Sequence, residues 1–311
     1  MEESLKQYVI GLDMGGTHIR VGAVTQEGTL HYFSKVKTKD VMDPFNPIKS
    51  LANFVKNYID SQIVDGQVVA VGIGFPSVVS KDKKSIYSTP NLDYLSNINI
   101  VDPLQELVEM PVFINRDVNF LMQYELSQRE LNREEIVLGF YIGTGFGNAI
   151  YLNQQFLEGK NGAAGELGHI PILHNDVVCG CGNVGCVEGI ASGKKLVSIH
   201  QEFFRDIPFE EIFVSCSNEP IIDDFLQSLA IPIATELNIF DPHVVILGGG
   251  VIGMTNFPKK SLEEYIIKYT RKPVPAEGIT FEYALDTSSA GVLGAASYIY
   301  EKLRNKTVQF M

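Results

Sequence analysis

The stretch Ile10-Gly11-Leu12-Asp13-Met14-Gly15-Gly16-Thr17 has a counterpart later in the chain, Phe140-Tyr141-Ile142-Gly143-Thr144-Gly145-Phe146-Gly147. Each stretch is an apolar run broken by glycines, and each leads into a second strand-like run, at residues 19–24 and 148–152. Apolar runs joined by glycine-rich turns are typical of paired strands. The sequence therefore predicts two related strand-turn-strand units, each opening a lobe of its own.

Helical and strand patterns alternate through the rest of the chain, which is typical of α/β lobes. Asn46-Pro47 is a residue pair preferred at the start of a helix. Pro232 lies inside a predicted helix and predicts a kink or an interruption there. The predicted helices cover residues 47–63, 118–131, 187–200, 221–239 and 290–303; the predicted strands cover residues 68–75, 112–114 and 244–247, with a hairpin over residues 77–88.

The length of the chain, 311 residues, is enough for two cores, because a typical domain takes roughly 100–200 residues. The second strand-turn-strand unit starts near Ile136, so we place the boundary between the lobes near residue 120. The helical run from residue 290 is expected to return to the first lobe. We predict an N-terminal lobe of residues 1–119 and 290–311, and a C-terminal lobe of residues 120–289.

The charge of the chain limits its partners. The formal net charge is −12, whereas nucleic acids and anionic membranes attract basic proteins, so we expect neither as a partner. The segment before Tyr8 is polar and lacks the pattern of a signal peptide, and the longest apolar runs fall short of the about 20 residues that span a bilayer. We therefore expect a cytoplasmic protein that binds small molecules.

The first glycine-rich turn is a candidate phosphate site. Because glycines lack a Cβ, the amides of Gly15 and Gly16 can approach phosphate oxygens, and Thr17 can donate its hydroxyl. Asp13 can orient Mg²⁺ or its waters. We add the neighbouring His18 to the residues expected to bind ATP. A plain hairpin with a glycine turn is the alternative, since short glycine motifs match often by chance.

Two further glycine clusters favour a nucleotide site. A second turn of the same kind comes from the other lobe and consists of Gly143, Thr144, Gly145 and Gly147. Two facing turns can clamp a triphosphate. A third cluster follows the strand at residues 244–247 and consists of Gly248, Gly249 and Gly250. Ligands bind outside the carboxyl ends of such strands, so this cluster is a candidate wall for the adenosine, or else an ordinary turn into a helix. None of the three clusters fits a P-loop or a G-x-G-x-x-G turn.

A cysteine cluster predicts a metal site. Three of the four cysteines fall within eight residues, at Cys179, Cys181 and Cys186. Disulfides are not expected in an acidic chain without an export signal, and interleaved glycines let the chain wrap round an ion. Zinc takes four tetrahedral nitrogen or sulfur ligands, so we choose His169 as the fourth, with His174 as its substitute. Reduced cysteines that happen to cluster are the alternative, and Cys216 is expected to be a buried thiol.

Three carboxylates are candidates for contact with a substrate. Glu166 lies three positions before His169, and Glu188 lies two after Cys186. A closed structural zinc would therefore hold both carboxylates near the metal, where they could accept hydrogen bonds from sugar hydroxyls. Without that tether either would more often be a solvated surface residue. Asp117 follows the strand at 112–114 and could receive the proton of an attacking hydroxyl; its alternative role is a helix N-cap.

These segments together resemble the ROK family of bacterial sugar kinases and repressors over almost the whole chain. The motifs that carry the resemblance are Asp13-x-Gly15-Gly16-Thr17, Thr89-Pro90-Asn91-Leu92, Asp117-Val118-Asn119, Gly143-Thr144-Gly145, Gly165-Glu166-Leu167-Gly168-His169, Cys179-x-Cys181-Gly182-x-x-Gly185-Cys186-x-Glu188 and Gly248-Gly249-Gly250. Seven motifs in the right order make the resemblance specific.

The resemblance implies an actin-like ATPase fold, α/β in class, in which two related lobes enclose a cleft for ATP with Mg²⁺ and a sugar. It implies that Asp117 is the general base and that the zinc ligands are His169, Cys179, Cys181 and Cys186. The sugar-binding positions it implies are Asn91, Arg116, Asp117, Glu166, His169 and Glu188. It also implies a homodimer. His169 would then serve both the metal and the sugar, which is chemically sensible because a metal-bound histidine keeps a second ring nitrogen.

One departure from the family pattern concerns the substrate. Glucose-type members carry Asn-Asp-Ala-Asn where this chain has Arg116-Asp117-Val118-Asn119, and arginine offers donors only, so the pattern of hydroxyls it selects should differ. This motif, with the segments at residues 74–83 and 88–92, resembles the D-allose kinase branch. We therefore expect D-allose to become D-allose 6-phosphate. A glucokinase or N-acetylmannosamine kinase is the alternative, and a sugar-responsive repressor is disfavoured because no basic helix-turn-helix segment is visible.

Overall fold

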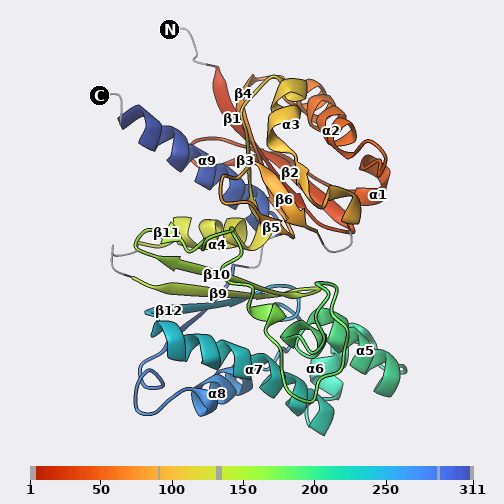
Figure 1. Cartoon of the computed structure of the whole chain (residues 1–311), viewed down its shortest axis with the longest axis vertical. Coiled ribbons are helices and arrows are strands. Elements are labelled where there is room, and N and C mark those ends of the chain that lie inside the picture. Colours follow the sequence, from red (N-terminus) through yellow and green to blue (C-terminus); the bar gives the residue numbers. More distant parts are fainter. Residues whose placement is uncertain (1–4, 90–91, 131–134, 286–287, 309–311) are drawn as a thin grey trace. The chain divides into compact units, whose positions relative to one another are not determined.

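The computed structural model describes residues 5–89, 92–130, 135–285 and 288–308, with side chains up to Arg304. The chain separates into two compact units (Figure 1). Unit 1 comprises Met1–Glu130, Glu158–Ala163 and Thr287–Met311, and unit 2 comprises Leu131–Leu157 and Ala164–Asp286. Among the helices so described, none is long and apolar enough to cross a membrane.

Unit 1 is built on a five-stranded sheet in the order β3-β2-β1-β4-β8. β1, β2 and β3 form an antiparallel meander, whereas β4 runs parallel to β1 and β8 parallel to β4. The strands of this sheet are β1 (Lys6–Met14), β2 (His18–Val24), β3 (Leu30–Lys37), β4 (Gly66–Phe75) and β8 (Val112–Arg116). A small antiparallel sheet beside it consists of β5 (Val78–Val79), β6 (Ser85–Ser88) and β7 (Ile98–Asn99).

Both faces of the central strand β1 are buried. Successive side chains of a strand point to opposite sides of the sheet, and on each side they pack in a core. Tyr8 and Leu12 pack in the core that includes α2 and α3, and Val9 packs in the opposite core with α9. Gly11 lets α9 approach closely, since a Cβ there would collide with the carbonyl of Val292. The helices of unit 1 are α1 (Thr38–Val41), α2 (Pro47–Gln62), α3 (Val101–Val108), α4 (Asp117–Ser127) and α9 (Ala290–Val308), with the short η1 (Asp93–Leu95).

Unit 2 repeats this connectivity in the order β11-β10-β9-β12-β13. Its first three strands are again an antiparallel meander, and its last two again run parallel. The strands are β9 (Val137–Ile142), β10 (Phe146–Leu152), β11 (Gln155–Phe156), β12 (Val244–Gly248) and β13 (Thr280–Tyr283). The two predicted strand-turn-strand openings are therefore β1-β2 and β9-β10, and they occupy equivalent places in two related sheets.

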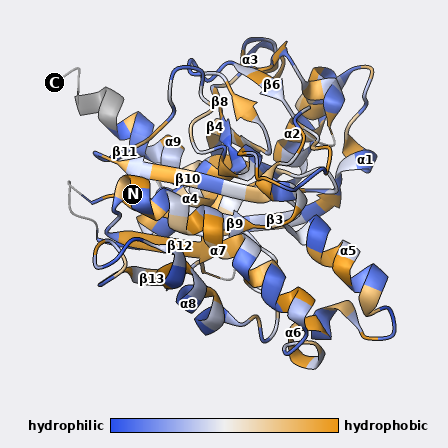
Figure 2. Cartoon of the chain, turned by 60° about the horizontal axis from the view of Figure 1, so that its bottom comes forward, coloured by the Kyte–Doolittle hydropathy of each residue, from blue (hydrophilic) through white to orange (hydrophobic). Residues whose placement is uncertain are grey.

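The helices of unit 2 cover its sheet with an apolar face, and β12 is hydrophobic along most of its length (Figure 2). They are α5 (Gly193–Phe203), α6 (Ile212–Ser215), α7 (Pro220–Phe240) and α8 (Lys259–Tyr269), with the short η2 (Leu167–His169), η3 (Val187–Gly189) and η4 (Phe209–Glu211). The predicted helix over residues 187–200 is divided, because Ser192 caps α5 by accepting the N–H of Lys195. α7 continues through Pro232, so the interruption predicted there does not occur.

Helix α4 belongs with unit 1, and the boundary predicted near residue 120 falls inside it. α4 packs on α9: the rings of Phe120 and Tyr298 lie 5.6 Å apart, and Gln123 donates to Glu301 at 3.1 Å. The residues Glu158–Ala163 also lie with unit 1, although the strand before them belongs to unit 2. The close approach of Gly162 to the carbonyl of Val79 accounts for this, since no Cβ would fit there.

Candidate active site

The first glycine turn joins β1 to β2 in unit 1. The N–H of Gly15 donates to the carbonyl of His18 at 2.9 Å, which closes the turn, and Gly16 and Thr17 are exposed. On the protein side, the carbonyl of Gly15 accepts the hydroxyl of Thr38 at 2.6 Å, and the carbonyl of Thr17 accepts the N–H of Thr38 at 3.0 Å. The turn is thus fixed before any ligand binds: the carbonyls of Gly15 and Thr17 are hydrogen-bonded, and Gly16 and Thr17 are open to solvent.

Asp13 lies at the end of β1, and its carboxylate accepts a hydrogen bond from the guanidinium of Arg20 at 3.0 Å. Burial raises the pKa of Asp13, and the positive charge of Arg20 opposes that rise. The Asp13 side chain is 19% exposed. Gly291, in the first turn of α9, adjoins the carboxylate; a Cβ there would lie 3.0 Å from Asp13 Cγ. The positive end of α9 also favours the ionised form.

The second glycine turn joins β9 to β10 in unit 2 and is held in a similar way. The N–H of Gly143 donates to the carbonyl of Gly145 at 3.1 Å. The carbonyls of Gly143 and Thr144 accept the N–H groups of Gly193 at 2.8 Å and Lys194 at 3.1 Å, which are the first residues of α5. Both glycine turns therefore have carbonyls fixed by the start of a helix.

The third glycine cluster lies beside the second turn. β12 runs parallel to β9, with Gly248 opposite Tyr141, so both strands end at the same edge of the sheet. Gly249 has φ +92° and packs against Ile142, whose backbone a Cβ would meet at 2.5 Å. Val251 N–H then donates to the carbonyl of Ile142 at 2.9 Å. Gly248 is thus the last residue of β12, one residue beyond the predicted end of the strand, and Gly249 and Gly250 follow it at the edge where ligands bind in α/β sheets.

Asp117 is the first residue of α4 and directly follows β8. Arg116, and not Asp117, occupies the N-cap position, so the N-cap alternative for Asp117 is wrong. One Asp117 oxygen accepts the N–H of Val118 at 2.7 Å. Gly74 on β4 lets α4 begin close to the sheet, because a Cβ there would lie 3.1 Å from the ring of Phe120 and 3.3 Å from Asp117 Cα. Arg116 itself is buried, with 7% of its surface exposed.

A buried amide fixes the corner between β8 and α4. Asn115 is fully buried, and its Oδ1 accepts three hydrogen bonds of 3.0 Å, from the backbone N–H of Arg116, the amide of Asn119 and the ammonium of Lys83. Lys83 also forms an ion pair with Glu158 at 2.7 Å. Burial lowers the pKa of Lys83, and Glu158 opposes that effect. Asn115 thus fixes the backbone before Asp117, through Arg116, and the helix after it, through Asn119.

The predicted zinc ligands come together in unit 2. The ligand atoms of His169, Cys179, Cys181 and Cys186 all lie within 4.8 Å of one another. Cys179 Sγ lies 3.5 Å from Nδ1 of His169, and Cys181 Sγ lies 3.6 Å from Cys186 Sγ. Zinc–sulfur bonds of about 2.3 Å in a tetrahedron separate two sulfurs by about 3.8 Å, so the residues fit a zinc ion. All four cysteines are free thiols, and Cys216 is buried elsewhere, as predicted.

The loop that carries the cysteines is shaped by short-range contacts. Val178 and Val184 form an isolated β-bridge, and the N–H of Cys179 donates to the carbonyl of Asn183 at 2.8 Å. Gly185 has φ +84° and lies so close to another part of the loop that a Cβ would meet the carbonyl oxygen of Asn175 at 2.6 Å. Gly182, with φ +95°, and Gly185 are therefore required by the fold of the loop itself.

The two glutamates near the metal cluster have different partners. Glu166 Oε2 lies 3.6 Å from Nε2 of His169, so the ring presents Nδ1 to the cysteines and Nε2 to the carboxylate side. Glu188 Oε2 accepts the N–H of Phe146 at 3.0 Å, and a Cβ on Gly145 would collide with this carboxylate. Glu188 thus joins the metal loop to the second glycine turn, a contact that motif spacing did not predict.

The candidate residues divide between the two units. Unit 1 brings together the first glycine turn, Asp13 and the corner at Asp117, and unit 2 brings together the other two glycine clusters and the metal loop. Asn91 lies outside the described residues, and His174 is not part of the metal cluster. Thr38 and Lys83 contribute to these arrangements, yet nothing in their sequence surroundings indicated it, since their partners lie 23 and 32 residues away.

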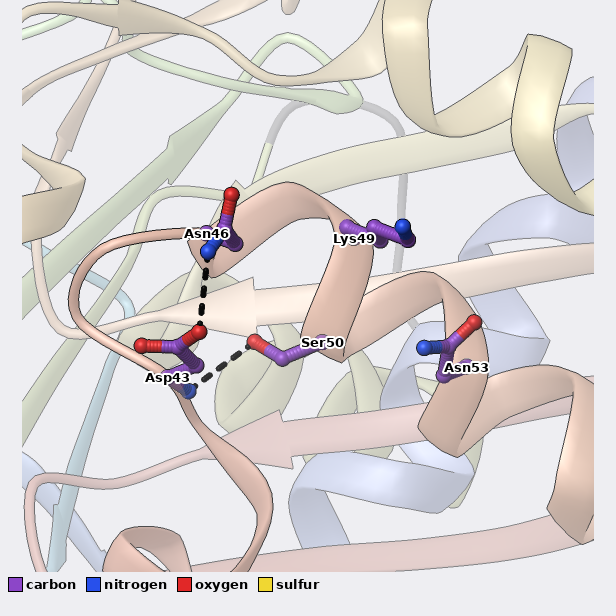
Figure 3. A pocket seen from close by; sticks show the side chains of 5 residues that line it. All are labelled: Asp43, Asn46, Lys49, Ser50 and Asn53. Atoms are coloured by element: carbon purple, nitrogen blue, oxygen red, sulfur yellow. Dashed lines mark hydrogen bonds between the residues drawn. The ribbon is translucent and has the colours of Figure 1, made fainter.

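A hollow in the surface of unit 1 lies at the start of α2 and is lined by Asp43, Asn46, Lys49, Ser50 and Asn53 (Figure 3). Its polar groups bind one another: Asn46 donates to Asp43 at 3.0 Å, and the N–H of Asp43 donates to Ser50 at 3.1 Å. None of these residues belongs to the candidate set. We assign the hollow no role in catalysis.

Comparison with known proteins gives the family. The profile of the ROK family matches residues 9–302. This chain belongs to the ROK family. It is 30% identical to an N-acetyl-D-glucosamine kinase of Pectobacterium carotovorum, over 92% of this chain and 97% of the relative. It is 28% identical to a glucokinase of Streptomyces coelicolor, over 94% and 97%.

Among solved structures, the ROK hexokinase of Thermus thermophilus is similar with a TM-score of 0.74 and 28% identity, over 96% of this chain and 99% of the hexokinase. The predicted fold class is thereby confirmed: two α/β lobes of the actin-like type, each with a mixed five-stranded sheet.

Proposed function

We propose that this chain is an ATP-dependent hexose kinase. The observation that carries the proposal is the pair of pre-built glycine turns, one in each unit, in a ROK chain that also holds a carboxylate at the corner of β8 and α4. Relatives named N-acetyl-D-glucosamine kinase, glucokinase and hexokinase support the same activity.

The glycine turns are the proposed sites for the phosphates of ATP. Backbone amides at Gly16 and Thr17 on one turn, and at Thr144 and Gly145 on the other, would donate to phosphate oxygens. Asp13 would hold Mg²⁺ through its waters, and the ion, when bound, neutralises charge on the β- and γ-phosphates. The glycine cluster at 248–250 would lie along the adenosine.

Asp117 is the proposed general base. It would accept the proton of the sugar 6-hydroxyl while that oxygen forms a bond to the γ-phosphorus. The bond from the γ-phosphorus to the bridging oxygen breaks, and ADP leaves with that electron pair. The products are a hexose 6-phosphate, ADP and a proton received by Asp117. The bonds on Asn115 support this role, because they fix the corner from which Asp117 projects.

The metal loop is the proposed wall of the sugar site. A closed zinc with four protein ligands supplies structure and no water activation. Its ligand His169 would keep Nε2, beside Glu166, for a hydrogen bond with a sugar hydroxyl. Glu188 would accept a hydrogen bond from another hydroxyl. The 3.6 Å separation of Glu166 and His169 and the link from Glu188 to the second glycine turn support placing these groups in one site.

The identity of the hexose rests on Arg116. The named relatives favour glucose or an N-acetylated hexosamine. Arg116, in the place where glucose-type members carry asparagine, favours D-allose, since a guanidinium donates to hydroxyls and accepts from none. We propose D-allose as the preferred sugar, with glucose and the N-acetylhexosamines as the alternatives.

A sugar panel tests the proposal and separates these substrates. ADP release should be measured with allose, glucose, mannose, fructose, N-acetylglucosamine and N-acetylmannosamine. We expect turnover with allose above the others, and we expect Arg116→Asn to shift the ratio of kcat/KM for allose over glucose by about 10- to 100-fold toward glucose. Arg129→Asn, which removes an arginine just after the end of α4 that pairs with Glu125, should leave the ratio unchanged. An unchanged ratio in Arg116→Asn would remove the allose assignment and leave the kinase.

A further inference from the structure

Thr38 contacts the first glycine turn with two groups at once. It is 2% exposed and begins α1, directly after β3. Its hydroxyl donates to the carbonyl of Gly15 at 2.6 Å, and its N–H donates to the carbonyl of Thr17 at 3.0 Å. A buried side chain thus reaches the tip of a turn 23 residues earlier in the chain.

The geometry of the peptide bond gives this contact a direction. A trans peptide is planar, and its C=O and N–H point in opposite directions. Because Thr38 holds the carbonyl of Gly15 on the protein side, the N–H of Gly16 in the same peptide must point away from Thr38, toward the exposed side of the turn. Among the backbone hydrogen bonds of the described residues, the N–H of Gly16 has no acceptor.

The second glycine turn supports the same principle independently. There the carbonyls of Gly143 and Thr144 are held by the N–H groups of Gly193 and Lys194. Planarity again directs the N–H groups of Thr144 and Gly145 away from α5. In unit 2 the carbonyls are held by backbone alone, whereas in unit 1 a side-chain hydroxyl holds the carbonyl of Gly15.

We propose that Thr38 is a positioning residue for ATP, which orients the Gly16 amide of the first turn toward a phosphate. The inference rests on the proposed kinase function and adds to it a residue that touches neither ATP nor sugar. Without the hydroxyl, the Gly15–Gly16 peptide can rotate, and the amide must be reoriented each time a nucleotide binds.

The test compares Thr38→Val with Thr38→Ser and with a matched control. Valine keeps the shape and removes the hydroxyl, and serine keeps the hydroxyl. Thr270→Val is the control, because Thr270 is also 2% exposed and donates its hydroxyl to a carbonyl, that of Ile266, at 2.8 Å in unit 2. For each protein, the Kd of the ATP analogue AMPPNP with Mg²⁺, the Kd of the sugar and the Tm should be measured.

We expect Thr38→Val to weaken AMPPNP binding by about 10-fold or more, with the sugar Kd unchanged and Thr38→Ser close to wild type. Thr270→Val should lower the Tm and leave both Kd values unchanged. If Thr38→Val does not fold, Thr38→Cys, whose thiol is a weak donor, should show a smaller loss of AMPPNP binding.

Wild-type affinity for AMPPNP in Thr38→Val or Thr38→Cys, or equal weakening in Thr270→Val, would overturn the role of Thr38 while the kinase proposal stands. A wild-type protein that binds no AMPPNP would overturn both.

Discussion

At the scale of single residues, the proposed base depends on neighbours that a motif does not contain. Asp117 was identified from its place after a strand, and the structure adds that Asn115 and Lys83 hold the backbone beneath it. The Lys83 side chain is 18% exposed, and its ammonium has Asn115 and Glu158 as partners. Removing a partly buried charge from such a network disturbs the positions of its neighbours more than removing a surface charge does.

Lys83→Met should therefore lower kcat by about 10-fold, because it releases Asn115 and loosens the corner that carries Asp117. The KM for ATP should stay unchanged, since the first glycine turn has separate anchors. Lys84→Met is the control: the neighbouring lysine pairs with Asp102 at 2.9 Å, and both side chains are about half exposed. Steady-state kinetics on both variants decide, and equal values for the two would refute a positioning role for Lys83.

At the scale of elements, sequence patterns predicted those features that depend on neighbouring residues in the chain. The glycine turns after β1 and β9 were predicted because Gly15, Gly143 and their neighbours meet constraints within a few residues. The division of the predicted helix at 187–200 was missed, although Ser192 is a residue type preferred at N-caps. Contacts over long sequence distances, such as Thr38 with Gly15, left no local pattern to recognise.

The metal loop allows a prediction at this scale. Cys181→Ser should release zinc, lower the Tm and raise the KM for the sugar by about 10-fold or more, because Glu166 and Glu188 lose the support of the metal. Cys181 is the exposed ligand, so this change disturbs packing least. Cys216→Ser, a buried thiol outside the cluster, is the control and should keep its zinc. Zinc content, Tm and kinetics should be measured together. Full sugar affinity in a zinc-free protein would contradict the proposal that zinc holds Glu166 and Glu188 in place for the sugar.

At the scale of the whole molecule, the repeat seen in the sequence corresponds to a repeat of topology. The orders β3-β2-β1-β4-β8 and β11-β10-β9-β12-β13 follow the same path, so each unit has a glycine turn at the equivalent place. The extents of the units were harder to predict. Helix α4 and residues 158–163 lie with unit 1 through contacts with α9 and Val79, which no periodicity reveals.

Hexose kinase activity with Asp117 as the base is tested most directly by measuring the sugar phosphate and ADP formed by the wild type and by Asp117→Asn, which removes the base and keeps the shape of the side chain. We predict that the wild type forms one hexose 6-phosphate for each ADP. Asp117→Asn should lower kcat by about 10²- to 10⁴-fold while it still binds AMPPNP and the sugar. A wild type that phosphorylates no hexose would refute the kinase activity, and an Asp117→Asn protein that turns over at the wild-type rate would refute Asp117 as the base.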